Sequence, residues 1–132
     1  MIGFGQNVSI PDANFKAYLV GNTDINTNGD TEIQVSEASS FGGSINIQSA
    51  NITNFTGIEA FTALTNLWCS GNQLSSLNLN SLTSLSALRC NSNLLTSLDV
   101  STNTALTYME CSNNQLTSLD VSTNTALTGL DC

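Results

Sequence analysis

The hydrophobic positions of this chain recur at a fixed spacing over its second half. When the sequence is aligned against itself, apolar and polar residues fall into columns that repeat every 21 residues. The columns are Leu64, Leu85, Leu106 and Leu127; Leu67, Leu88, Met109 and Leu130; Cys69, Cys90, Cys111 and Cys132; and Asn72, Asn93 and Asn114. A constant period of this length predicts a stack of similar coils, each burying its apolar side against its neighbours.

The columns spell LxxLxCxxNxL, which is the leucine-rich-repeat consensus with Cys in the third apolar position. The alternation of Leu67, Trp68 and Cys69 predicts a short strand whose side chains point inward and outward in turn. A looser coil precedes these repeats, with a spacing of 22 residues and Ala50 in place of the asparagine. We therefore expect a leucine-rich-repeat solenoid, a right-handed β/α superhelix of about 21-residue coils with a parallel sheet on one face.

The repeated asparagines and cysteines have different expected roles. Each Asn at the turn can bond the unpaired backbone of the neighbouring coil, so the column predicts an amide ladder. Cys69 and Cys132 lie three coils apart, about 14 Å at the spacing of paired strands, so the sulfurs form a row that excludes one tetrahedral zinc. Parallel Cβ vectors also hold neighbouring cysteines further apart than a usual disulfide, which favours free buried thiols.

Residues 11–21 predict a short amphipathic helix that covers the end of the solenoid core. Pro11 falls in its first turn, Phe15, Tyr18 and Leu19 form the apolar stripe, and Gly21 is the expected stop. We divide the 132 residues into an N-terminal tail (1–7), a helical cap (8–41) and the repeats (42–132), of which the last coil is incomplete.

Residues 26–37 of the cap align with the calcium-binding loop of an EF-hand. In this register the ligands are Asn26, Asn28, Asp30, the carbonyl of Glu32 and the bidentate carboxylate of Glu37. Asn26 replaces the usual opening Asp, and Thr31 stands where Gly normally supplies a positive φ, so weak binding is expected. The alternative is a hydrogen-bonded turn rich in Asn and Asp. In both cases the loop has a structural role, and no other cofactor is required.

Charge and composition exclude several kinds of function. The formal net charge is −8, and Lys16 and Arg89 are the only strong cations, which disfavours binding to nucleic acids and to anionic membrane surfaces. No apolar run reaches the roughly 18 residues that span a bilayer, so membrane insertion is not expected. The chain has no His, and its acids are scattered, so no catalytic set is expected and the chain is not interpreted as an enzyme.

Particular segments of the chain resemble a known family. They are IPDANFKAYL, the NTNGD to SEA loop, NITNFTGIEAFTALTNL and the CSxNQLTSLDVSxNTAL repeats. They look like secreted bacterial leucine-rich-repeat proteins of the internalin-like kind, especially those of Bacteroidetes, over residues 8 to 132. The resemblance implies an extracellular or cell-surface binding domain with an EF-hand-like N-terminal cap, and it does not specify a ligand.

The outward positions of the strands are the expected binding face. Most columns keep the same residue from coil to coil, whereas these positions vary and hold residue types that dominate interaction hot spots. The candidates are Asn66, Trp68, Arg89, Tyr108, Glu110 and Asp131. The simpler alternative is that exposed strand positions are unconstrained. A protein or a glycan is the expected ligand. A structural or ice-binding repeat is the competing class of function, and the open last coil allows self-association.

Overall fold

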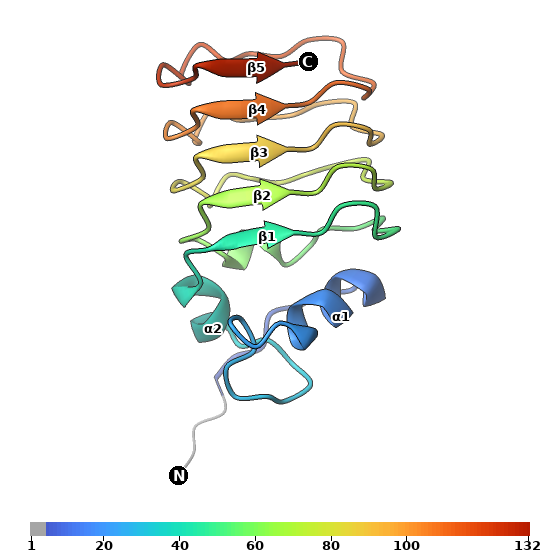
Figure 1. Ribbon diagram of the computed structural model, residues 1–132, viewed down its shortest axis with the longest axis vertical. Helices are drawn as coiled ribbons and strands as arrows, with labels where there is room; N and C mark the ends of the chain where they lie inside the picture. Colours follow the sequence, from blue (N-terminus) through green and yellow to red (C-terminus); the bar gives the residue numbers. More distant parts are fainter. Residues whose placement is uncertain (1–4) are drawn as a thin grey trace.

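The computed structural model describes residues 5–132, in which a parallel sheet covers one side of a stack of coils (Figure 1). Two helices precede the sheet, α1 (Ala13–Gly21) and α2 (Val35–Ser40). The strands are β1 (Ser44–Asn46), β2 (Asn66–Trp68), β3 (Ala87–Arg89), β4 (Tyr108–Glu110) and β5 (Gly129–Asp131). In the described coils the return segments consist of turns and a 3-10 helix, Ile58–Ala60. No helix of the described chain is both long and apolar enough to cross a membrane.

The strands lie in chain order, all parallel, and their register is the repeat period. Leu67 pairs with Leu88, Leu88 with Met109, and Met109 with Leu130, a step of 21 residues each time. Ile45 pairs with Leu67, a step of 22, as the looser first coil predicts. The predicted leucine-rich-repeat solenoid is confirmed in its parallel sheet and coil length.

The asparagine column forms the predicted ladder between coils. The Nδ2 of Asn93 donates to the carbonyl of Cys69 in the preceding coil at 3.1 Å and to that of Cys90 in its own coil at 3.0 Å. Its Oδ1 accepts from the backbone N–H of Leu74 at 3.1 Å. Asn72 and Asn114 make equivalent bonds one coil away on either side. Buried backbone groups at the bend are therefore paired by side chains.

A second buried asparagine column lies on the return side and was not predicted. The Nδ2 of Asn103 donates to the carbonyls of Leu79 and Leu82 at 3.0 and 2.9 Å, and Asn124 repeats the pattern one coil later. The sequence indicates this column through the tetrapeptide NTAL, which occurs at residues 103–106 and again 21 residues later at 124–127. Leu82 occupies the same position in the coil before, so this column begins only at Asn103.

The cap is joined to the first coil through Asp12. Its Oδ1 accepts from the backbone N–H groups of Asn14 and Phe15, both at 3.0 Å, and so caps α1. Its Oδ2 accepts from the backbone of Thr53 at 2.9 Å and of Asn54 at 3.3 Å. Burial raises the pKa of Asp12, but these hydrogen bonds outweigh it and hold the pKa below 3.8. One carboxylate thus starts the helix and fixes it to the solenoid.

Of the two expectations about the ends of α1, the one that places Pro11 in the first turn was wrong, and the end at Gly21 is confirmed. Pro11 precedes the N-cap Asp12 and lies outside the helix, because Asp12 supplies the side-chain acceptor that starts it. Gly21 is the last helical residue, and Asn22 forms the C-cap. The buried stripe holds Phe15 and Leu19, while Tyr18 is half-buried.

Part of the predicted tail is built into the cap. Residues 1–4 lie outside the described residues. Asn7 forms an antiparallel bridge with Gln34, and the N–H of Val35 donates to the carbonyl of Gln6 at 2.8 Å. Phe15 stacks on Phe55 of the first coil, with ring centroids 4.4 Å apart. The cap therefore closes the N-terminal end of the core with aromatic contacts as well as hydrogen bonds.

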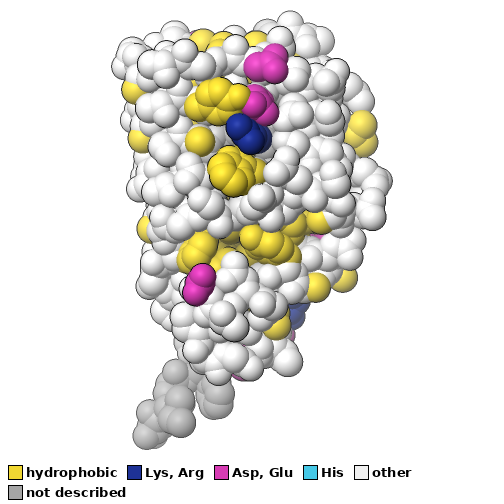
Figure 2. All heavy atoms as spheres, viewed as in Figure 1, with side chains coloured by type: hydrophobic (Ala, Val, Ile, Leu, Met, Phe, Trp, Pro, Cys, Tyr) yellow, Lys and Arg dark blue, Asp and Glu magenta, His cyan; other side chains and the backbone are white. Residues whose placement is uncertain are grey.

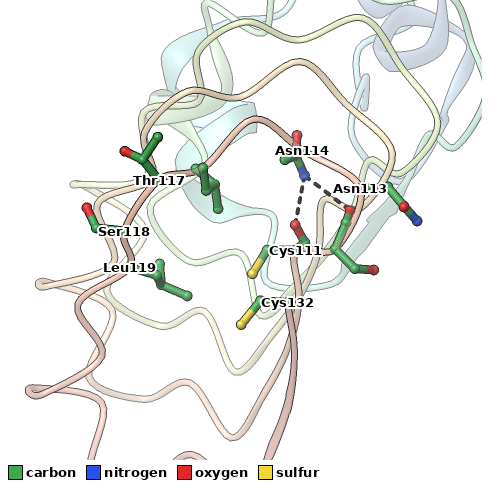
Figure 3. Close-up of a pocket in the computed structure, with 9 residues that line it drawn as sticks. Cys111, Asn113, Asn114, Thr117, Ser118, Leu119 and Cys132 are labelled. Atoms are coloured by element: carbon green, nitrogen blue, oxygen red, sulfur yellow. Dashed lines mark hydrogen bonds between the residues drawn. The ribbon is translucent and has the colours of Figure 1, made fainter.

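The core is covered at the cap and open at the last coil. Leu67, Leu88 and Met109 are fully buried, whereas Leu130 in the same column is 45% exposed. A cavity of about 230 Å³ opens there, and the sulfurs of Cys111 and Cys132 point into it (Figure 3). The thiols are free, as predicted, and those of Cys69, Cys90 and Cys111 are buried. The expectation of burial was wrong for Cys132, which follows the edge strand β5 of the described sheet and is exposed.

We predict that a thiol reagent such as DTNB at pH 8 modifies one cysteine per folded chain. Burial raises the pKa of Cys69 and of Cys111 to about 12 and also raises that of Cys90, so these thiols stay protonated and unreactive. Four thiols should react in guanidinium, and Cys132→Ser should leave none reactive in the folded chain. Rapid native reaction of two or more thiols would contradict this arrangement.

Candidate functional site

The outward side chains of β2 to β5 form two rows across the sheet. In each of β2, β3 and β4 the middle residue is buried and both flanking residues are half-exposed. The strand registers place the rows as Asn66, Ala87, Tyr108, Gly129 and Trp68, Arg89, Glu110, Asp131. Figure 2, which views this face, shows apolar, basic and acidic side chains gathered over the upper strands, with mostly uncoloured surface around them. The structure thus brings the variable positions together on one surface.

Arg89 is the centre of this surface. Its guanidinium carbon lies 5.4 Å from the ring centroid of Trp68 on β2 and 5.5 Å from that of Tyr108 on β4. Both distances are within the range of cation–π attraction. A planar guanidinium stacks on aromatic rings in a way that a lysine ammonium does not. Three consecutive coils therefore contribute one residue each to the same contact. Trp68 and Arg89 are 21 positions apart in the sequence, and Arg89 and Tyr108 are 19 apart.

Glu110 links the same cluster to the acidic end of the face. Its Oε1 lies 3.5 Å from the Nε of Arg89 and accepts a hydrogen bond from the hydroxyl of Tyr108. The hydrogen bond to the carboxylate raises the pKa of Tyr108 above 10.0, because ionisation would place two negative charges together. We call Trp68, Arg89, Tyr108 and Glu110 the Arg89 cluster.

Gly129 makes room for the tyrosine, a role that the sequence did not indicate. A Cβ at this position would lie 2.6 Å from Cδ2 of Tyr108, so the ring lies directly over β5. A larger residue would displace Tyr108 from its contact with Arg89. Asp131 follows on the same strand, is exposed, and pairs in register with Glu110.

Asn66 lies on the same face but belongs to a different network. Its Nδ2 donates to the hydroxyl of Ser44 on β1 at 2.9 Å, and its Oδ1 accepts from the hydroxyl of Ser86 at 3.4 Å. These bonds tie three coils together through polar groups. Among the predicted residues, the structure therefore joins four in the Arg89 cluster, places Asp131 beside it, and ties Asn66 to Ser44 and Ser86.

The cap loop predicted to bind calcium is closed by hydrogen bonds among its own residues. Asn26 is buried, and its Nδ2 donates to the carbonyls of Val20 at 2.9 Å and Asp30 at 2.8 Å. Asn28 accepts from the backbone N–H of Asp30 at 2.9 Å and donates to the Asp30 carboxylate at 3.1 Å. Glu32 forms an ion pair with Lys16 at 2.7 Å. These are the bonds of a turn rich in Asn and Asp.

Glu37 holds this loop against α2. One oxygen accepts from the backbone of Thr27 at 2.8 Å and of Asn28 at 3.2 Å, and the other accepts from the backbone of Gln34 at 3.0 Å. Burial raises the pKa of Glu37, but these bonds outweigh it and lower the pKa below 4.5. Within residues 5–132, no three Asp, Glu, Cys or His side chains are grouped so that they could hold a metal ion. The carboxylate therefore acts as a clamp on backbone N–H groups, and calcium binding stays a prediction.

The positive φ in this loop belongs to Gly29, at 72°, and Thr31 is not among the residues with positive φ. Thr31 therefore needs no positive φ, because the glycine two positions earlier makes the sharp turn.

Residues 29–132 match the family model described as the leucine-rich-repeat domain of the endo-β-N-acetylglucosaminidase EndoS. The chain belongs to this EndoS-type leucine-rich-repeat family. The match begins within the cap loop and extends through α2, the sheet and the Arg89 cluster. A search of curated proteins finds no match.

Solved structures similar to this EndoS-type domain include three proteins of Listeria monocytogenes. The functional domain of InlJ, described as including a cysteine ladder, is 38% identical with a TM-score of 0.85 and aligns with 100% of this chain. An internalin C2 is 16% identical with a TM-score of 0.81 over 98% of this chain, and an internalin inlF is 20% identical with a TM-score of 0.76 over 92%. The last two show the fold alone. The EndoS-type domain spans 30% of the InlJ chain, 60% of the internalin C2 chain and 36% of the inlF chain.

We predict that Glu37→Gln lowers the melting temperature of the EndoS-type domain in EDTA. The substituted amide presents N–H groups to backbone donors, and losing charge-assisted bonds costs about 1.5–3 kcal/mol. Glu32→Gln, which removes an exposed ion pair, should change stability by less than about 1 kcal/mol. Because the folded-state pKa of Glu37 is lowered, its contribution is present above about pH 4.5 and is lost as the pH falls through that pKa.

The same melting experiment with added calcium separates the two interpretations of the loop. If the predicted calcium site exists, calcium raises the melting temperature of the wild-type chain and not that of Glu37→Gln. Equal melting of wild type and Glu37→Gln in EDTA would contradict the clamp.

Proposed function

We propose that this chain is an extracellular or cell-surface binding module that recognises a protein or glycan ligand through the outward face of β2 to β5. The observation that carries the proposal is the Arg89 cluster, in which one cation lies near two aromatic rings and one carboxylate from three successive coils. Solenoids present such faces as continuous binding surfaces. Trp, Tyr and Arg are the residues most enriched at interaction hot spots.

The internal contacts of the cluster support binding because they fix its side chains before a ligand arrives. Trp68, Arg89 and Tyr108 hold one another, so less side-chain freedom remains to be lost on association. The five-stranded sheet beneath them provides a rigid base. A surface with exposed residues that were merely unconstrained would not be expected to have such mutual contacts.

A protein ligand is favoured over a glycan. Binding of a sugar ring uses an open aromatic face, whereas here the guanidinium of Arg89 lies over both the Trp68 and the Tyr108 ring. The hydroxyl of Tyr108 is also engaged by Glu110. The cluster therefore offers partly covered rings, a charged fork and carboxylate oxygens, which suit the mixed surface of a protein.

The proposal also places the chain outside the bacterial cell. It rests on the resemblance of the cap and repeats to secreted internalin-like proteins and on the 38% identity to the InlJ domain. A calcium ion in the cap loop would be structural and is not needed at the binding face.

An ice-binding role is less well supported than recognition of a macromolecule. Flat arrays of threonine bind ice through hydroxyl groups that remain free, but here the hydroxyls of Thr107, Thr128, Thr102 and Thr123 donate to carbonyls of the preceding coil at 3.0–3.1 Å. They act as rungs between coils. Absence of thermal hysteresis would agree with this role.

Self-association through β5, the edge strand of the described sheet, is a second binding mode that we keep in the proposal. Leu130 is 45% exposed and β5 has one unpaired edge, a combination that favours edge-to-edge pairing. It would appear as a sedimentation coefficient that rises with protein concentration.

The test of the proposed face is binding to a glycan array and to a panel of purified extracellular proteins. We predict that Trp68→Ala with Arg89→Ala weakens every specific interaction of the wild-type chain at least about tenfold, as expected for hot-spot residues. The control is Thr83→Ala with Thr104→Ala, two exposed positions one period apart away from the strands, which should leave binding unchanged. Equal affinity of the wild type and the Trp68/Arg89 variant for the captured ligand would refute the face.

A further inference from the structure

The outward face of the sheet carries more negative than positive charge. Among the outward residues of β2 to β5, Arg89, Glu110 and Asp131 carry charge. The Arg89 guanidinium lies near two rings and pairs with the Glu110 carboxylate, which leaves Asp131 as the charge without an ion-pair partner among the described residues. The face therefore presents negative charge, on a chain whose formal net charge is −8.

The carboxylates of Glu110 and Asp131 lie at the same end of the face. The two residues are register partners on β4 and β5, so their Cα atoms are about 4.8 Å apart. Glu110 is held through Oε1 by Tyr108 and Arg89, and its Oε2 has no partner in the described part of the chain. Asp131 is exposed, and within residues 5–132 its side chain forms no ion pair.

Aromatic surface adjoins this negative end. The Tyr108 ring lies over Gly129, which is two positions before Asp131 on β5, and Trp68 flanks Arg89 on the other side. A side chain with an aliphatic stem and a cationic head fits this arrangement. The stem would pack against the Tyr108 ring, and the head would lie between the carboxylates of Glu110 and Asp131.

We infer that the ligand of this face is a basic protein segment, in which a Lys or Arg side chain packs along Tyr108 and is bound by Glu110 and Asp131. This inference rests on the proposed function and specifies the chemistry of the partner. An acidic partner would meet the unpaired carboxylate of Asp131 and would be repelled. The net charge of the chain also speeds encounter with a cationic partner.

The chain contains a matched control for this acidic pair. Asp99 and Asp120 are also one period of 21 residues apart, and both are exposed on the return side of the coils. Each accepts from the backbone of the serine two positions later, Ser101 at 2.9 Å and Ser122 at 2.8 Å, and so closes its own turn. Neutralising either pair changes the net charge by the same amount, and only the Glu110 and Asp131 pair adjoins the Arg89 cluster.

The test uses the full chain and capped decalysine and decaglutamate peptides as probes, with binding followed by two-dimensional NMR and calorimetry. Decalysine should shift the amide signals of β4 and β5 most, and decaglutamate should not bind. Glu110→Gln with Asp131→Asn should weaken decalysine binding at least fivefold more than Asp99→Asn with Asp120→Asn. Equal weakening by the two double variants would show attraction by net charge alone and would overturn the inference, as would shifts centred elsewhere.

Two further measurements distinguish failure of the basic-partner inference from failure of the proposed binding face. If the first double variant unfolds, Asp131→Asn alone replaces it, because this exposed side chain forms no hydrogen bond or ion pair within the described chain. Asp131→Asn should then weaken binding at least twofold. If the Trp68/Arg89 variant loses its ligand while Glu110→Gln with Asp131→Asn retains it, the binding face stands and the basic partner is refuted. If the Trp68/Arg89 variant retains the ligand, the proposed function itself fails.

Discussion

The hydrogen bonds that buried asparagine side chains make between coils are the constraint on which the rest of this structure depends. A coil of this kind bends sharply at the end of each strand, which leaves backbone N–H and C=O groups inside the bend without partners. Asn72, Asn93 and Asn114 satisfy them, each bridging its own coil and the one before. Unpaired buried groups cost about 1–3 kcal/mol each, so a slip of the register would be costly. The ladder therefore fixes the 21-residue step.

The fixed step is also what creates the binding face. Trp68, Arg89 and Glu110 occupy one row because their strands are in register, and Tyr108 reaches the same place from the neighbouring row. Two recurring features of the repeat, the inward leucines and the buried Cys69, Cys90 and Cys111, form the core beneath the strands, while the outward residues vary from coil to coil. A solenoid can thus change its surface from coil to coil at little cost in stability. In this chain the variation concentrates an aromatic, cationic and acidic cluster beside an acidic strand end.

Much of the fold was predictable because its determinants are periodic. The columns of Leu, Cys and Asn gave the strand register, the sheet and the first asparagine ladder, since each depends on a residue type recurring at one spacing. One periodic feature was missed, the second asparagine column of Asn103 and Asn124, and the other missed features are not periodic. Asp12 contacts Thr53 across 41 positions, Glu37 clamps a loop ten positions before it, and Gly29 takes the positive φ in place of Thr31. No spacing rule indicates such contacts.

The sequence predicted which residues form the candidate site but not how their side chains are arranged. The outward strand positions named Trp68, Arg89, Tyr108 and Glu110, yet nothing in the sequence showed that Arg89 would lie near both rings. That arrangement depends on side-chain directions and on Gly129, whose missing Cβ leaves room for Tyr108. Asn66 shared the same sequence pattern and was drawn into a polar network with Ser44 and Ser86.

The most direct test of this account is a double-mutant cycle on the free energy of unfolding for Trp68→Ala, Arg89→Ala and the double variant, measured by urea denaturation. If stacking of the coils builds the Arg89 cluster in the free chain, the two substitutions are coupled by about 0.5–1 kcal/mol, the range of a partly exposed cation–π contact. Additive effects within about 0.3 kcal/mol would mean that the two side chains do not interact across the coils, and they would contradict the account.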